Sequence, residues 1–341
     1  MAADIFQTQA WFDNLRAHGF ESPPQVHSVA LLADGADGAA AAQLHLMPWA
    51  DGGVLGSLSN YYSCLYGPVA SQGTLDAVSP PRWREVARSI RRLPGSAVVR
   101  LQPLDAQADW LSRLEHALRA SGYFTDRYFC FGNWYQPAVA GGFDAYWAAR
   151  PSALRHSVER GRKRLDKCGP WRTEIVANDP ERVELVLDAY QRVYAQSWKA
   201  PEPCPGFMPG LIRTAARQGW LRLGVLWLGD EPLAAQVWLV HGGKASIYKL
   251  AYARGHEKLS AGSVLTTALM RHALDVDGVE EIDYLSGDDA YKADWMAARR
   301  ERVGLVAFDL RRWRGLLGAA RHAAGRLRTA GKTRQAGDGP S

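Results

Sequence analysis

The sequence predicts a layered α/β protein with two domains, each a mixed, mostly antiparallel sheet flanked by helices. Three observations support this. The chain has 341 residues, which is too long for one small core and suits two. Hydrophobic residues make up 47% and charged residues 22%, as in an ordinary globular protein. Segments with strand-like and helix-like periodicity alternate in both halves of the chain, which favours a mixed α/β layer over a bundle or a sandwich.

In the first half, hydrophobic spacing and turn residues predict the order β-β-β-α-β-α-β after an opening helix. That helix covers residues 5–18, where Phe6, Ala10, Trp11 and Leu15 share one face and Gly19 follows. The other predicted elements are strands at 26–32, 43–48, 54–58, 97–101 and 129–134, and helices at 82–93 and 106–121.

The second half repeats this outline in the order α-α-β-β-β-α-β-α-β. Two hairpins are the strongest local signals, because Gly229-Asp230 and Gly242-Gly243 are suited to tight turns between strands. The predicted elements are helices at 180–199, 208–218, 263–276 and 291–300, and strands at 221–228, 232–241, 245–252, 281–285 and 305–310.

The segment 143–167 joins the two halves and ends in a strongly basic helix. Arg160 and Arg164 lie one turn apart and share a face, as do Lys163 and Lys167. This pattern is compatible with a solvated helix surface. It is equally compatible with a basic wall near a phosphorylated ligand.

The net charge of +6 belongs to the C-terminal tail. Residues 311–341 carry eight Lys or Arg and one acid, a charge of +7, so the remaining 310 residues sum to −1. The body is therefore close to neutral, and we expect no DNA partner. Within 310–327, apolar residues recur at helical spacing between arginines, which predicts a basic amphipathic helix and a flexible end. Such a helix suits peripheral contact of residues 311–328 with an anionic membrane surface, or docking on the N-terminal domain.

Several classes of protein are disfavoured by the sequence. Cys64, Cys130, Cys168 and Cys204 are too far apart for paired zinc ligands or a dense disulfide framework. No run of about 20 apolar residues predicts a membrane-spanning helix. The opening residues lack a basic-then-apolar leader. We therefore expect a cytoplasmic protein without a bound metal, with peripheral contact at the inner face of the membrane left open.

A loop followed by a helix in the second half is suited to binding an anion. The strand predicted at 245–252 leads into Gly255, His256 and Lys258 and then into Ser260-Ala261-Gly262-Ser263 at the start of a helix. Small residues at a helix start let backbone N–H groups approach an anion, and the helix dipole favours negative charge there. Small residues also begin helices that bind nothing.

This strand, loop and helix, followed by a second strand, resembles the acyl-CoA-binding core of the GNAT superfamily of N-acyltransferases. Where that family carries Q/R-x-x-G-x-G/A, this chain has residues 257–262, EKLSAG. Serine replaces the first glycine, and the leading basic residue is absent.

A second stretch is more specific. Residues 283–295, DYLSGDDAYKADW, resemble the D-x-x-x-G-D-x-x-Y-K-x-x-W signature of the polysaccharide-biosynthesis or FemAB-like branch, including CelD-like proteins. The stretch LSAGSVL, the basic helix and the N-terminal DIFQTQAWFDNL are also similar to that branch. The resemblance covers most of residues 145–310 and the N-terminal half in outline. It implies two tandem GNAT-like domains, residues 1–145 and 146–310, the second carrying the acyl-CoA site, and a tail at 311–341.

The resemblance implies direct attack of an amine on a thioester of acyl-CoA, which serves as co-substrate. The amine must first lose a proton, so a carboxylate is needed. Asp288 and Asp283 are the candidates, and Asp288 is preferred because it lies just beyond its strand. Tyr291 could protonate the departing thiolate. Turn formation and core packing are the alternative roles of these residues.

The residues that would hold the substrates come partly from the resemblance and partly from the charged loop, the basic helix and tryptophans suited to stacking on a sugar. The backbone of Leu250 and Ala251 would polarise the thioester carbonyl. The donor would be bound by Leu250, Ala251, His256, Lys258, Ser260, Ala261, Gly262 and Ser263. The acceptor, a small or lipid-linked sugar with an amine, would contact Lys292, Trp295, Arg160, Arg164 and Trp198.

Two other functions remain open. Fem-type enzymes use aminoacyl-tRNA, and the basic helix at 155–167 could serve that larger anion. A degenerate transferase could instead act as a non-catalytic scaffold in a polysaccharide pathway.

Overall fold

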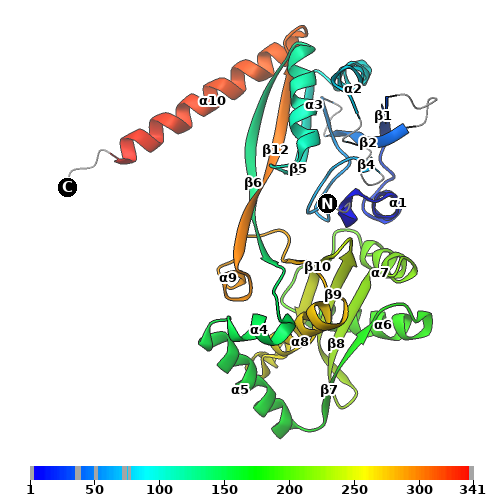
Figure 1. The fold of residues 1–341 in the computed structure, drawn as a ribbon, viewed down its shortest axis with the longest axis vertical. Helices are drawn as coiled ribbons and strands as arrows, with labels where there is room; N and C mark the ends of the chain where they lie inside the picture. The colour runs from blue at the N-terminus through cyan, green and yellow to red at the C-terminus, as the bar shows by residue number, and fades with distance from the viewer. Residues whose placement is uncertain (1–3, 35–39, 50–52, 71–74, 76–77, 338–341) are drawn as a thin grey trace. The chain divides into compact units, whose positions relative to one another are not determined.

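The computed structural model describes residues 4–34, 40–49, 53–70, 75 and 78–337. The chain divides into two compact units, each discontinuous in sequence (Figure 1). Unit 1 consists of Met1–Pro23 and Phe131–Arg300, and unit 2 of Pro24–Cys130 and Glu301–Ser341. The chain passes between the units within two long strands, β6 (Tyr123–Pro137) and β12 (Ala298–Asp309). These units do not have the boundaries at 145 and 310 expected from the sequence, and the assignment of two tandem GNAT-like domains stays a prediction.

Unit 1 opens with η1 (Ile5–Gln7) and α1 (Gln9–His18). Thr8 caps the start of α1 with its side chain and Gly19 ends the helix, as predicted. The remaining elements of the unit are α4 (Gly142–Ala148), α5 (Ser152–Cys168), β7 (Trp171–Val176), α6 (Pro180–Gln196), α7 (Phe207–Arg217), β8 (Leu221–Leu228), β9 (Glu231–His241), β10 (Lys244–Tyr252), η2 (Glu257–Leu259), α8 (Ala261–Arg271), η3 (His272–Val276), β11 (Glu281–Asp283) and α9 (Lys292–Trp295).

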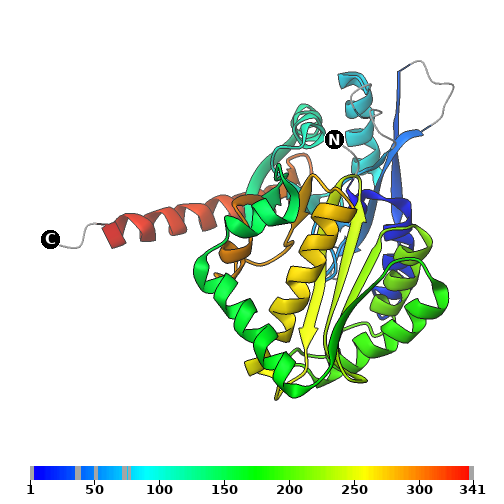
Figure 2. The same cartoon turned by 60° about the horizontal axis from the view of Figure 1, so that its bottom comes forward.

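The strands of unit 1 follow the order β6-β11-β10-β9-β8-β7. All neighbours pair antiparallel except β10 and β11, which are parallel. Helix α8 covers one face of this sheet, and α6 lies on the other (Figure 2). Because both faces of β9 are covered, nearly every residue of that strand is buried. The mixed, mostly antiparallel sheet flanked by helices confirms the predicted fold class.

Unit 2 contains the strand order β1-β2-β3-β5-β12, with β4 paired to β2. Its buried ion pair joins Arg91 to Asp309, with a distance of 3.0 Å from Nε to Oδ2 and no exposure of the Asp309 side chain. The other elements are β1 (His27–Leu32), β2 (Ala40–Trp49), β3 (Val54–Ser57), β4 (Val69–Ala70), α2 (Pro80–Arg92), β5 (Val98–Asp105), α3 (Asp109–Ala120) and α10 (Trp313–Gly337).

Helix α10 contains the amphipathic segment predicted in the tail, but it docks through a different face. Gly318 packs against Phe308 and Val98, and His322 Nε2 lies 2.6 Å from Asp126 Oδ2. The predicted apolar residues Trp313, Leu316 and Leu317 are exposed instead. The glycines allow this close contact because they have no side chain. Residues 338–341 of the predicted flexible end, and the side chain of Leu327, lie outside the part of the chain that the structure describes.

Several element predictions were wrong in detail. The helix expected at 5–18 is divided into η1 and α1, with Thr8 between them. Strand β7 was missed, because it is an edge strand with exposed polar residues and no clean alternation. The two-residue β4 was also missed. The helix expected at 291–300 ends at Trp295, since residues from Ala298 onward extend β12. None of the described helices combines the length and the apolar character needed to cross a bilayer.

Candidate active site

The central feature of unit 1 is the point where two parallel strands separate. Pairing of β10 with β11 runs from Lys244 opposite Glu281 to Ser246 opposite Asp283, where β11 ends. Strand β10 continues to Tyr252, and its register with β9 shifts between Ile247 and Lys249. A bulge in this position increases the local twist and turns the end of β10 away from β11. The last residues of β10 therefore lie beyond the parallel pairing.

Backbone strain is concentrated beside this separation. Among the described residues, the non-glycine positions with positive φ are Ser260 (52°) and Leu285 (55°). Ser260 directly precedes α8, and Leu285 follows β11. Such conformations cost of order 1–3 kcal/mol each and cluster at functional sites. The two strained positions mark the loops on either side of the separated strands.

The predicted donor-binding loop leads to the start of α8. The first backbone amides of any helix lack an acceptor within the helix; in α8 these are the amides of Ala261, Gly262 and Ser263. The side chain of Ser260, the N-cap residue, forms no capping hydrogen bond with them. A Cβ atom built on Gly262 would meet only Tyr252 Cδ1, at 3.4 Å. The side-chain amide of buried Gln236 donates to the carbonyl of Gly262 (2.9 Å) and to Thr266 Oγ1 (2.7 Å). These hydrogen bonds from Gln236 hold the first turn of α8 in place, and its backbone amides can bind an anion.

The basic helix α5 packs against this loop. A Cβ atom at Gly161 would lie 2.8 Å from the carbonyl oxygen of Leu259, so only glycine allows the approach. Arg164 Nη1 donates to the Lys258 carbonyl oxygen at 2.6 Å. Arg160 is exposed, and within the described residues no hydrogen bond or ion pair joins it to the loop. In the loop itself, Lys258 is exposed, and His256 Nε2 lies 4.0 Å from Glu231 Oε1. The structure therefore joins Arg164 to the predicted loop but leaves Arg160 apart.

Asp283 is fully buried in a network of polar side chains. Its Oδ1 accepts from Asn133 Nδ2 (2.6 Å) and the Leu285 amide (2.7 Å). Its Oδ2 lies 2.6 Å from Arg300 Nη2 and 3.3 Å from Lys244 Nζ. A buried carboxylate paired in this way is expensive to disturb. Through these contacts, Asp283 links β11 to β6 and β12, which is a structural role.

Asp288 lies at the surface and forms a bidentate ion pair with Arg299. Arg299 Nη2 is 2.6 Å from Asp288 Oδ2, and Arg299 Nε donates to Oδ1 at 3.0 Å. Trp134 Nε1 also donates to Oδ1, at 2.8 Å. The hydrogen bonds from Arg299 hold the pKa of Asp288 below its ordinary value. A carboxylate with a lowered pKa is a weaker base.

The remaining predicted residues after β11 differ in exposure. Lys292 is 4% exposed, and its ammonium donates to the carbonyls of Ser286 (2.6 Å) and Gly287 (3.1 Å), which holds the loop in place. Tyr291 is 47% exposed and packs edge-on against Tyr284, with ring centroids 5.8 Å apart. Burial raises the pKa of Tyr291, so its phenol keeps its proton at neutral pH.

Trp295 lies in the core and cannot stack on a sugar in this structure. It is 4% exposed, its ring centroid is 6.1 Å from that of Trp147, and its carbonyl accepts from the Tyr146 hydroxyl. Trp198 is 44% exposed instead, and its ring lies 4.4 Å from that of Tyr252 at the end of β10. Of the two tryptophans, only Trp198 is exposed beside the separated strands.

A lysine cluster beside β10 was missed by the sequence analysis. Lys249 Nζ lies 2.8 Å from Glu202 Oε1, with side-chain exposures of 11% and 9%; the contact is an ion pair rather than an aligned hydrogen bond. Burial, and then the charge of Lys249, lower the pKa of the nearby Lys199 to about 8; the charge of Glu202 opposes this shift, and Lys292 adds a smaller lowering effect. Glu202 and Lys199 follow α6 and meet β10 only in the folded chain, so no local pattern could have found them.

Within the described residues, no three His, Cys, Asp or Glu side chains come together in a way that could hold a metal ion. None of the four cysteines forms a disulfide.

Separated parallel strands beside a helix start suited to an anion are compatible with an acyltransferase. Residues 152–293 match the family model described as the acetyltransferase (GNAT) domain. The chain carries a GNAT acetyltransferase domain within a GNAT-superfamily, FemAB-like fold, and it is an acyltransferase.

Solved structures show the same fold at low sequence identity. FemX has a TM-score of 0.63 and 12% identity, covering 91% of this chain and 93% of its own. The C-terminal domain of a protein assigned as a lysylphosphatidylglycerol synthetase from Agrobacterium fabrum has a TM-score of 0.52 and 14% identity, with coverages of 82% and 84%. L-PGS from Bacillus licheniformis has a TM-score of 0.52 and 11% identity, with coverages of 96% and 99%. No curated protein sequence matches this chain.

Proposed function

We propose that this protein transfers an acyl group from acyl-CoA to an amine, with an amino sugar or an envelope or exopolysaccharide precursor as the acceptor. The observation that carries the proposal is the separation of β10 from β11 after Ser246 and Asp283, directly beside the start of α8. In the proposed complex, the extended donor would lie where the two strands separate. The amides of Ala261, Gly262 and Ser263 suit the pyrophosphate, and His256 and Lys258 add positive charge.

In the proposed reaction, the amine nitrogen attacks the thioester carbonyl carbon. A C–N bond forms, the C–S bond breaks, and the thiolate leaves with a proton from Tyr291. The backbone of Leu250 and Ala251, beyond the parallel pairing, would stabilise the oxyanion; one such donor is worth roughly 3 kcal/mol. Trp198 would contact the acceptor, and Lys292 would hold the loop that forms one wall of the site.

The amine must lose a proton, and two groups compete to accept it. Asp288 is the candidate from the sequence, but its ion pair with Arg299 lowers its pKa. Lys199 has a pKa of about 8, so a useful fraction of its amine is neutral at physiological pH. Lys199 also lies near Lys249 of β10 and beside Trp198. We favour Lys199 as the proton acceptor, with Glu202 holding Lys249 next to it.

A Fem-type transferase that takes its acyl group from aminoacyl-tRNA is the second candidate. It is supported by the likeness to FemX over nine-tenths of both chains, and by the excess of Lys and Arg over acidic residues in α5. Tight binding of CoA alone would count against it. A strongly salt-dependent affinity for tRNA would support it.

We also propose a peripheral membrane contact for α10 at the inner face of the membrane, which would bring the enzyme to a lipid-linked acceptor. Trp313 and Leu316 are 69% and 51% exposed, and arginines flank them. Apolar residues beside basic ones suit an anionic bilayer surface.

The first experiment is a thermal-shift titration with CoA, acetyl-CoA and longer acyl-CoAs. A ligand at 100 times its dissociation constant stabilises by about 2.7 kcal/mol, which such a scan detects. The variant Gly262→Trp should fold, because a Cβ there meets only Tyr252 at 3.4 Å, and it should lose the shift. Gly325→Trp on α10, where a Cβ meets nothing within 4 Å, is the matched control and should keep it.

The outcomes separate the candidates. A shift with CoA that only Gly262→Trp removes supports the donor site at residues 254–263. No shift with any CoA species, together with tRNA binding, would favour the Fem-type reaction. No response to either donor would favour a non-catalytic scaffold.

A further inference from the structure

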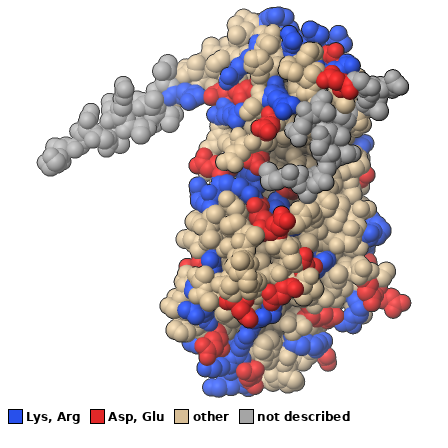
Figure 3. Space-filling view, in the orientation of Figure 1, with Lys and Arg blue, Asp and Glu red and all other residues tan. Residues whose placement is uncertain are grey.

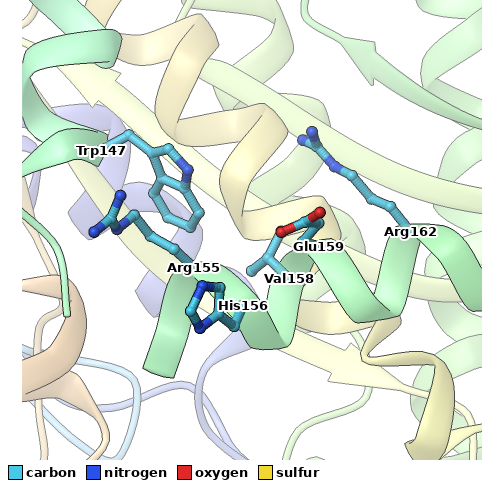
Figure 4. Close-up of a pocket in the computed structure, with 6 residues that line it drawn as sticks. All are labelled: Trp147, Arg155, His156, Val158, Glu159 and Arg162. Carbon is cyan, nitrogen blue, oxygen red and sulfur yellow. The ribbon is translucent and has the colours of Figure 1, made fainter. Parts of the chain in front are cut away.

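A pocket lies between α4 and α5, away from the separated strands. It has a volume of about 340 Å³ and is lined by Trp147, Arg155, His156, Val158, Glu159 and Arg162. In Figure 4 the side chains of Trp147, Arg155 and Arg162 lie on the same side of α5, with Val158 and Glu159 between the two arginines. The volume is at the lower end of the range for small-molecule sites and much larger than a single phosphate needs.

The pocket is on a different flank of α5 from the donor loop. Residues 155, 159 and 162 recur at helical spacing on one flank, whereas Gly161 and Arg164 face the loop on the other. The buried residues Val158 and Leu165 lie between these two flanks. A ligand in this pocket would therefore occupy a site of its own.

The charge of the pocket favours an anion. Glu159 is paired with Lys163 of the next turn at 2.8 Å, which offsets its negative charge. Within the described part of the chain, Arg155 and Arg162 form no ion pair with a carboxylate. Lys and Arg side chains gather over α5 at the lower left of Figure 3. Arg155 and Arg162 lie two helical turns apart, on either side of Glu159 (Figure 4), so each can bind the oxygens of a different phosphate group with charge-assisted hydrogen bonds.

The indole of Trp147 gives the pocket a flat aromatic wall. It is held from behind by Phe143, whose ring is nearly parallel (16°) at a centroid distance of 5.8 Å, and by Trp295 at 6.1 Å. A tryptophan fixed in this way loses little conformational entropy when a ligand packs on it. Stacking of a nucleobase on an aromatic side chain is worth roughly 1–3 kcal/mol and tolerates any base.

From these contacts we infer that the pocket between α4 and α5 binds a nucleotide with more than one phosphate group, with the base against Trp147 and the phosphate groups on Arg155 and Arg162. This site is separate from the proposed donor loop, and its occupancy does not depend on acyl transfer.

The test uses the full chain and isothermal titration with adenosine 3′,5′-bisphosphate, pyrophosphate and adenosine. The double variant Arg155→Gln/Arg162→Gln should weaken bisphosphate binding at least tenfold. The matched double variant Arg160→Gln/Lys167→Gln removes the same charge from α5 outside the pocket lining, and it should change the affinity less than threefold. Trp147→Leu should weaken the bisphosphate more than pyrophosphate, which has no base.

Three results would overturn the inference. Equal losses in the two double variants would show a diffuse effect of helix charge. No binding to the wild type at millimolar bisphosphate would show that the pocket takes no nucleotide. Loss of binding in Gly262→Trp, with none in Arg155→Gln/Arg162→Gln, would assign the nucleotide to the donor loop. If Trp147→Leu fails to fold, the arginine variants still decide the question, because their side chains are exposed.

Discussion

Individual residues in the site have roles that depend on their partners more than on their type. Asp283 ends β11 and Asp288 lies in the loop that follows, yet the first is buried against Arg300 and the second is exposed against Arg299. In both cases an arginine stabilises the ionised carboxylate, which favours structure over proton transfer. Lys199 is the reverse case, because burial and a neighbouring cation favour its neutral form.

The pKa of Lys199 gives a prediction at this scale. Acyl transfer should rise with pH to a midpoint near 8, because the neutral amine of Lys199 is the form that accepts a proton. Lys249→Met removes the cation that lowers this pKa, so the midpoint should move to higher pH. The measurement is the pH dependence of kcat for the wild type and this variant.

Deprotonation of the acceptor amine itself would also make acyl transfer rise with pH. Comparing the wild type with Lys249→Met separates the two effects, because this variant leaves the acceptor unchanged. Asp288→Asn serves as the second control. A midpoint that stays in place in Lys249→Met, with activity lost in Asp288→Asn, would assign the proton transfer to Asp288 instead.

At the scale of elements, glycine positions decide which surfaces meet. Gly161 lets α5 approach Leu259 at the donor loop, and Gly315 and Gly318 let α10 approach β12. These contacts turn the glycine-containing faces of both helices inward. On α10 the result is that Trp313, Leu316 and Leu317 remain outside.

This exposed stripe predicts membrane binding by α10. The double variant Trp313→Ser/Leu317→Ser should reduce co-sedimentation with phosphatidylglycerol vesicles several-fold, because a buried side chain of this size contributes about 1.5–3 kcal/mol. Leu185→Ser on α6 is the matched control, since Leu185 is 61% exposed but has no place in the stripe. Equal binding of all three proteins, or equal binding to neutral vesicles, would contradict the prediction.

At the scale of the whole molecule, the compact units are not continuous in sequence. Unit 1 needs Met1–Pro23 and the second part of β6 as well as the matched GNAT segment. Trp11 and Phe12 of α1 are each 1% exposed, and Asn133 of β6 donates to Asp283. A contiguous piece lacking these residues would expose apolar surface and leave a buried carboxylate short of a donor.

The corresponding prediction concerns two fragments. Residues 146–310 alone should aggregate or unfold without cooperativity, because β11 loses its pairing with β6 and the α1 contacts disappear. Residues 1–23 linked to 131–300 should unfold cooperatively in urea. Circular dichroism during the titration distinguishes them, and a stable, cooperative 146–310 fragment would show that the sequence boundaries describe a domain.

The sequence by itself determined the local elements and the family resemblance. Hydrophobic periodicity and glycine turns placed the hairpins of β8, β9 and β10, and the run from Asp283 to Trp295 identified the loop after β11, because these signals are local. Tertiary structure decided which of the named residues meet. Lys199, Glu202 and Lys249 are joined by packing of the segment after α6 on β10, and Trp147 meets Arg155 and Arg162 through the bend between α4 and α5. The ion pair of Lys249 with Glu202 and the lowered pKa of Lys199 arise from contacts between segments that are distant along the chain, and no local spacing encodes them.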